Sequence, residues 1–118
     1  MEHARAVSHP TSRLDPAIHQ PARLGILSAT SETKRIDFVS LRDLLDLTDG
    51  NLSRHLATLE NAGYIKIEKT FEGRKPRTWI SATRAGRKAL EKEIAALREI
   101  VDAAAAPAKR TLPGPQAA

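Results

Sequence analysis

Apolar residues recur at helical spacing in four stretches of the chain and at alternate positions between the last two. The first stretch contains Leu24 and Leu27, which are three residues apart. Asp15 followed by Pro16 is typical of a helix start, and Pro21 then predicts either a kink in that helix or the first residue of a second one. The chain is therefore expected to open with one or two short helices.

The next two helical stretches are short and are separated by a tight turn. Residues 36–38 alternate as a very short strand does, and Ser40 can cap a helix that ends near Leu47. A second helix is expected at about residues 49–62, with Gly63 as its left-handed stop. Its apolar face carries Leu52, Leu56 and Leu59. Two short helices joined by such a turn form a helix-turn-helix candidate.

The hydrophobic period becomes alternating after Gly63. Residues 64–82 contain alternating apolar and polar positions on both sides of a turn-rich EGRKP segment, which predicts a hairpin. Thr83 can cap a last helix whose apolar residues recur at spacings of four, three and four. These residues are Leu90, Ile94, Leu97 and Val101. The spacing is that of a short coiled-coil seam, and packing of this face on the domain itself is the alternative.

Composition fits one small, mostly helical domain with an aliphatic core. The chain has 118 residues, 3% aromatic residues and no Cys, which excludes disulfides, thiolate zinc sites and a cysteine nucleophile. Residues 1–14 and 104–118 lack periodicity and are expected to be disordered tails around a domain at residues 15–103. No apolar run approaches the roughly 18 to 20 residues of a membrane span, so a soluble, cytoplasmic protein without a membrane partner is expected.

Positive charge is concentrated on the predicted hairpin. The formal net charge is +5. Residues 63–84 carry six basic and two acidic side chains, whereas residues 15–62 carry five basic and seven acidic side chains. The cluster includes Arg74, Lys75 and Arg77. On charge alone, a solvated hairpin and a polyanion-binding surface explain the cluster equally well.

The polar face of the helix expected at residues 49–62 favours nucleic-acid binding. With the leucines turned inward, a rotation of about 100° per residue places four polar side chains outward and two at the edges. The outward residues are Asn51, Arg54, Thr58 and Asn61, and the edge residues are Ser53 and His55. Arg suits guanine edges, Asn suits adenine, and Ser or Thr can bond bases or phosphates. An ordinary solvated face is the alternative, but it would more often carry Glu and Lys.

The run LTDGNLSRHLATLENAGYIKIEKTFEGRKPRTWISATRAGRKAL resembles the winged-helix transcriptional regulators of the MarR and ArsR type. In that family a recognition helix ends in a Leu-Glu-x-Ala-Gly-Tyr step, here residues 59–64, and leads into a basic β-wing. A Thr-x-x-Gly helix start follows, here residues 83–86. The resemblance covers about residues 15–103. It implies an α+β, mostly helical fold: a winged helix-turn-helix with a C-terminal dimerisation helix.

The resemblance also implies a regulator that binds double-stranded DNA and represses promoters by occupying them. The recognition helix would enter the major groove and contact DNA through Asn51, Ser53, Arg54, His55 and Thr58. The wing tip at Arg74 and Lys75 would follow the backbone or minor groove, with Arg77 as a further DNA contact. The Cys-containing motif of the metal-sensing branch has no counterpart here, so no metal or other cofactor is expected. Whether a small-molecule effector exists is left open.

Members of the resembled family commonly dimerise through their terminal helices, which implies a homodimer. The expected interface residues are Leu24, Leu27, Leu90, Ile94, Leu97 and Val101. Glu93 and Arg98 would fall at g and e positions, where a parallel partner brings them together. A winged helix used as a protein-protein interaction module is the alternative function. An enzyme is not expected, because no acid-base pair, activated nucleophile or phosphate-cradling loop is visible.

Overall fold

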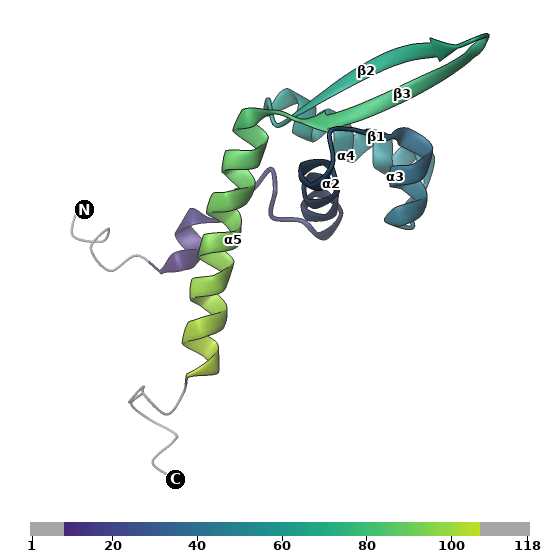
Figure 1. Cartoon of the computed structure of the whole chain (residues 1–118). Helices are drawn as coiled ribbons and strands as arrows, with labels where there is room; N and C mark the ends of the chain where they lie inside the picture. The colour runs from purple at the N-terminus through teal and green to yellow at the C-terminus, as the bar shows by residue number, and fades with distance from the viewer. Residues whose placement is uncertain (1–8, 107–118) are drawn as a thin grey trace, which may run out of the picture.

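The computed structural model of the chain describes residues 9–106, and it contains helices around a small antiparallel sheet (Figure 1). The helices are η1 (Pro10–Arg13), α2 (Pro21–Glu32), α3 (Phe38–Leu44), α4 (Asp49–Asn61) and α5 (Arg84–Ala105). The strands are β1 (Ile36–Asp37), β2 (Ile65–Glu72) and β3 (Lys75–Ala82), in the order β1-β3-β2. The predicted mostly helical α+β fold, with a helix-turn-helix before a hairpin, is confirmed.

The hairpin and α5 leave the helical body in different directions. Figure 1 shows α2, α3 and α4 packed together beside the sheet, the free end of β2 and β3 reaching beyond them, and α5 extending away. Residues 10–13, which sequence alone assigns to a tail, form η1, and Arg13 pairs with Glu99 of α5 at 2.6 Å. Residues 104 and 105, also predicted to be tail, are the last two residues of α5. Residues 1–8 and 107–118 lie outside the described part of the chain. Within residues 9–106, every helix is too short or too polar to cross a membrane.

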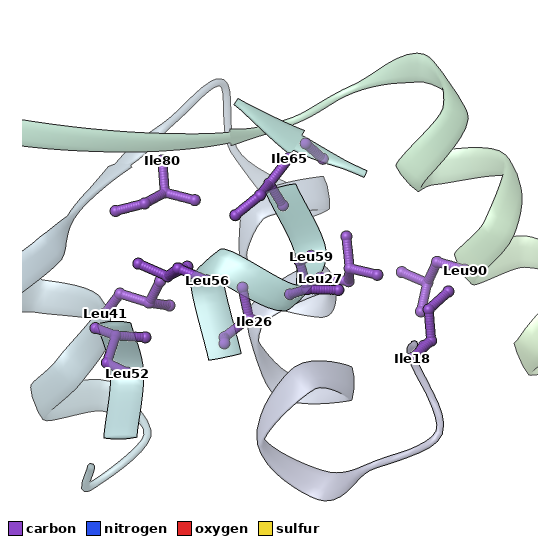
Figure 2. Close-up of a cluster of buried hydrophobic side chains, with 11 residues drawn as sticks. Ile18, Ile26, Leu27, Leu41, Leu52, Leu56, Leu59, Ile65, Ile80 and Leu90 are labelled. Atoms are coloured by element: carbon purple, nitrogen blue, oxygen red, sulfur yellow. The ribbon is translucent and has the colours of Figure 1, made fainter. Parts of the chain in front are cut away.

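The hydrophobic core joins every layer of the body (Figure 2). It is built from Ile18, Ile26, Leu27, Leu41, Leu52, Leu56, Leu59, Ile65, Ile80, Ala82 and Leu90. The three leucines of α4 are all buried, as their spacing predicts. Burying one such side chain contributes about 1.5 to 3 kcal/mol, so α4 is held firmly by its inner face and its outer face is free to carry polar residues.

Two of the expected helix starts are wrong. Asp15 and Pro16 begin a turn, in which the Ala17 amide donates to Asp15 Oδ1 at 2.9 Å. The alternative that Pro21 is the first residue of a helix is confirmed by α2. Asp37, rather than Ser40, caps α3, because the Ser40 amide and hydroxyl both donate to the Asp37 carboxylate. The hydroxyl bond is the main reason why the pKa of Asp37 is lowered.

Both ends of α4 are fixed by local hydrogen bonds. Thr48 caps its first turn, where Thr48 Oγ1 accepts from the Asn51 amide at 3.1 Å. At the other end Gly63 has φ of 82°, a left-handed conformation that favours glycine. The Gly63 amide donates to the Glu60 carbonyl and the Tyr64 amide to the Leu59 carbonyl, which is a Schellman motif. The predicted stop at Gly63 is confirmed.

Candidate nucleic-acid interface

The outer side of α4 presents a pair of polar side chains that are held side by side. Asn51, Ser53 and Arg54 are exposed, and Arg54 Nη2 donates to Asn51 Oδ1 at 2.7 Å. Thr58 is half-buried one turn later, and its hydroxyl donates to the Arg54 carbonyl at 3.3 Å. The structure therefore brings three of the five predicted recognition residues, Asn51, Arg54 and Thr58, onto one helix surface, with the guanidinium and amide groups already adjacent. Ser53 is exposed on the side of α4 that faces the hairpin.

His55 differs from the other four because it contacts a neighbouring helix. It is half-buried, and its Nδ1 lies 3.1 Å from Nη1 of Arg23 on α2. Burial, followed by the positive charges of Arg23 and Arg54, lowers the pKa of His55. A lowered His pKa means that the folded state favours the neutral ring more than the unfolded state does. The stability that the neutral ring contributes is therefore lost as the pH falls through the ordinary His range. His55 thus connects α4 to α2.

Arg23 extends this connection to the segment before α2. Its Nε donates to the Ala17 carbonyl at 2.7 Å. The same segment reaches the residue that follows α4, because the Tyr64 hydroxyl donates to Asp15 Oδ2 at 2.5 Å. That hydrogen bond is the main cause of the raised pKa of Tyr64. Sequence reasoning missed these positioning residues, because no local pattern relates residues that are dozens of positions apart.

The hairpin tip is a two-residue turn that carries positive charge. Glu72 pairs with Lys75, which leaves Gly73 and Arg74 as the turn. Gly73 has φ of 66° at the first turn position, where glycine is favoured in type II′ hairpins. Arg74 and Lys75 are both exposed. The predicted wing tip therefore carries two exposed cationic side chains. Figure 1 shows that this end of the hairpin lies away from the helices.

The two faces of the hairpin have different surroundings. Ile67 and Lys69 line one side of a groove of about 430 Å³, whose other side includes Ser53 and Ala57 of α4. Arg77 lies on the opposite face, because side chains alternate along a strand and Arg77 is next to Thr78, which lines the groove. Arg77 is therefore separated from the face that overlooks α4.

On the face of the hairpin that points away from α4, two contacts within the protein hold the Arg77 side chain. Arg77 Nη1 is 3.5 Å from Glu72 Oε2, and the guanidinium lies 5.3 Å from the centre of the Trp79 ring. Among the predicted wing contacts, Arg74 and Lys75 stand at the tip, and Arg77 is held further back.

The residues predicted for a dimer interface divide into two groups. Leu27 and Leu90 belong to the core of this chain, and Leu24 packs against that core. Leu97 is half-buried, whereas Ile94 is 39% exposed and Val101 is 61% exposed. Leu27 and Leu90 are thus buried within this chain, whereas Ile94 and Val101, together with the half-buried Leu24 and Leu97, leave apolar surface that a partner could cover.

Glu93 corrects the coiled-coil interpretation of α5. Its side chain is fully buried, Oε1 accepts from the Asp15 amide at 2.9 Å, and Oε2 is 3.0 Å from His19 Nδ1. The expectation that Glu93 meets Arg98 of a partner is therefore wrong. Glu93 instead binds the N-terminal segment of its own chain to α5.

Residues 22–101 match the family model described as a winged helix DNA-binding domain. The chain belongs to this winged-helix family. Solved structures of similar proteins support this assignment. A transcriptional regulator homologue from Pyrococcus horikoshii OT3 shares 28% identity, covers 87% of this chain and 97% of its own, and has a TM-score of 0.73. AbsC, a MarR family transcriptional regulator from Streptomyces coelicolor, shares the fold at 23% identity. The match covers 65% of this chain and 56% of AbsC, with a TM-score of 0.54. The predicted resemblance to winged-helix transcriptional regulators is confirmed.

Two curated relatives of this winged-helix protein each match 72 residues, or 61% of the chain. One is an uncharacterized protein from Methanocaldococcus jannaschii, with 35% identity over 78% of its length. The other is riboflavin kinase from Haloquadratum walsbyi, with 39% identity, and the chain spans 29% of its length. The family model and the solved structures above are those of a winged helix DNA-binding domain and of transcriptional regulators, and the match to the kinase covers 29% of that protein. Within the described residues, no group of three or more His, Cys, Asp or Glu side chains could hold a metal ion.

Proposed function

We propose that this protein is a homodimeric, sequence-specific repressor that binds double-stranded DNA in the cytoplasm and occupies promoters. The observation that carries the proposal is the exposed Arg54 and Asn51 pair on α4 beside a hairpin with a cationic tip. Guanidinium and amide groups match the edges of guanine and adenine in the major groove. Cationic side chains away from the bases match phosphates. An interaction module for proteins would require neither feature.

In this arrangement α4 lies in the major groove. Arg54 and Asn51 read base edges, and Ser53 and Thr58 bond bases or phosphates. Arg74 and Lys75 hold the backbone at the neighbouring minor groove. His55 and Arg77 act at the margins of the surface, where Arg23 and Glu72 also hold them.

A second copy of the chain is the partner that best covers the exposed stripe of α5. Ile94, Leu97 and Val101 follow one another at spacings of three and four residues, which places them on one side of a helix. The last turns of α5 extend away from the body (Figure 1), so two such helices can pair without disturbing the domain. A two-fold dimer would place its recognition helices in successive major grooves, about 10 base pairs apart, and would select a palindromic site.

Replacing Val101 by Glu is expected to convert the dimer into a monomer, because a charge would be buried against the partner at the C-terminal end of the apolar stripe. Light scattering would report the halved mass. Selection from a pool of random duplexes would yield two half-sites for the unchanged protein and a single half-site for Val101→Glu. Ala95→Lys is the matched control, since Ala95 is exposed about 100° around the helix from Ile94. A Val101→Glu protein that stays dimeric, or an unchanged protein that is monomeric, would contradict the proposed assembly.

A further inference from the structure

Phe71 is the most exposed large apolar side chain in the described part of the chain, at 70%. It directly precedes the last residue of β2 and pairs with Pro76 of β3. The other aromatic side chain of the same hairpin is fully engaged: Trp79 Nε1 donates to Thr70 Oγ1 at 3.0 Å, and the Arg35 guanidinium covers its ring at 3.9 Å. Trp79 thus has a role within the protein, whereas the ring of Phe71 is left to solvent at the tip of the hairpin.

Strand alternation places Phe71 on the face of the hairpin that overlooks α4. Ile65 is buried, Ile67 and Lys69 line the groove beside α4, and Phe71 is the next residue in the same series. The two acidic residues of the hairpin, Glu68 and Glu72, belong to the other series and therefore lie on the other face. The face of Phe71 accordingly combines an apolar ring with a cation and carries no acid.

The reach of the strand fits the spacing of grooves in DNA. Phe71 is six residues beyond Ile65, which corresponds to about 20 Å at about 3.3 Å per residue. Adjacent major and minor grooves are separated by about half a helical turn, or about 17 Å. With α4 in a major groove, the tip of the hairpin would lie over the neighbouring minor groove.

We propose that Phe71 enters this minor groove and packs against its deoxyribose walls, while Arg74 and Lys75 hold the flanking phosphates. The proposal rests on the DNA-binding function proposed above. Proteins that bind the minor groove commonly place apolar side chains there beside cationic ones, because the groove is narrow, has apolar walls and is strongly negative at its rim. Phe71 would then supply an apolar contribution to affinity that does not depend on salt.

Binding of the full chain to a duplex selected by the unchanged protein tests the role of Phe71, with fluorescence anisotropy measured at several salt concentrations. Phe71→Ala is expected to weaken binding about tenfold at every salt concentration and to leave the salt slope unchanged, because no charge is removed. Phe71→Leu should retain most of the affinity. Leu44→Ala is the control, because Leu44 is 63% exposed on α3, and its affinity should equal that of the unchanged protein.

The outcomes separate this proposal from the function on which it rests. If the unchanged protein binds the duplex and Phe71→Ala binds equally well, the minor-groove role of Phe71 is overturned and DNA binding stands. If the unchanged protein does not bind DNA, both proposals are overturned. Thermal denaturation of Phe71→Ala should match the unchanged protein, because the removed ring is largely in solvent, so a loss of affinity will not reflect unfolding.

Discussion

Replacing Gly86 by Ala is expected to lower the free energy of unfolding by about 3 kcal/mol. A Cβ at this position would lie 2.1 Å from the Tyr64 carbonyl oxygen and 2.9 Å from its carbon. Neither helix α5 nor Tyr64 can shift cheaply, because the Thr83 amide donates to that same carbonyl and the Thr83 hydroxyl donates to the Gly63 carbonyl at 2.7 Å. Thermal denaturation should show a midpoint roughly 12 to 24 °C lower.

Gly50→Ala is the matched control for this steric argument. Gly50 also lies in a helix, but a Cβ there would meet nothing within 4 Å. Because Ala restricts the unfolded chain, Gly50→Ala should raise the free energy of unfolding by about 0.5 kcal/mol. A Gly86→Ala protein that melts within 3 °C or so of the unchanged one would show that the junction of β2, β3 and α5 is not as tight as the structure indicates.

Arg54→Ala is expected to cost about 1 to 3 kcal/mol of specific DNA binding and to relax the preference for one base pair. Asn51 Oδ1 already orients the guanidinium at 2.7 Å, so little ordering is left to occur on binding. Anisotropy titrations against the selected duplex, and against duplexes with single base-pair changes, would measure both effects. The loss should be largest for the selected site and small for random DNA.

Lys92→Ala controls for the loss of one positive charge, because Lys92 is exposed on α5, away from the proposed surface. It should leave the base preference unchanged. If Arg54→Ala kept both the affinity and the base preference of the unchanged protein, α4 would not be the element that reads the DNA sequence.

Much of the fold could be predicted because local patterns determine it. The buried leucines of α4, the stop at Gly63, the hairpin and the Thr83 cap each depend on residues within a few positions of one another. The cap of α3 was assigned wrongly because Asp37 and Ser40 are both good capping residues. Sequence alone does not say which of the two takes the non-helical backbone conformation.

The packing of α5 was harder to predict because the same spacing of apolar residues serves packing on the domain and packing on a partner. Leu90 lies in the core while Val101 is exposed, although both belong to the same periodic series. Which part is covered depends on the segment before α2, whose backbone binds Glu93 from 78 positions away. Helical periodicity identifies an apolar stripe, but it does not identify the chain that covers it.

The exposure of the candidate site residues could be predicted where the buried leucines alone determine it. Asn51 and Arg54 are exposed as expected from the position of the buried leucines. The contact between His55 and Arg23 spans 32 positions and has no local signal. Strand alternation, by contrast, contains enough information to place Arg77 and Phe71 on opposite faces of the hairpin.

Salt titration of binding to random duplex DNA, with the unchanged protein and an Arg74→Ala, Lys75→Ala double variant, tests the central claim most directly. The account predicts a steep fall in affinity with salt, and a slope that is flatter by about two units in the double variant, because two phosphate contacts are lost. Equal slopes for the two proteins would contradict binding of the wing to the DNA backbone. Absence of binding by the unchanged protein even at low salt would contradict DNA binding altogether and favour an interaction module.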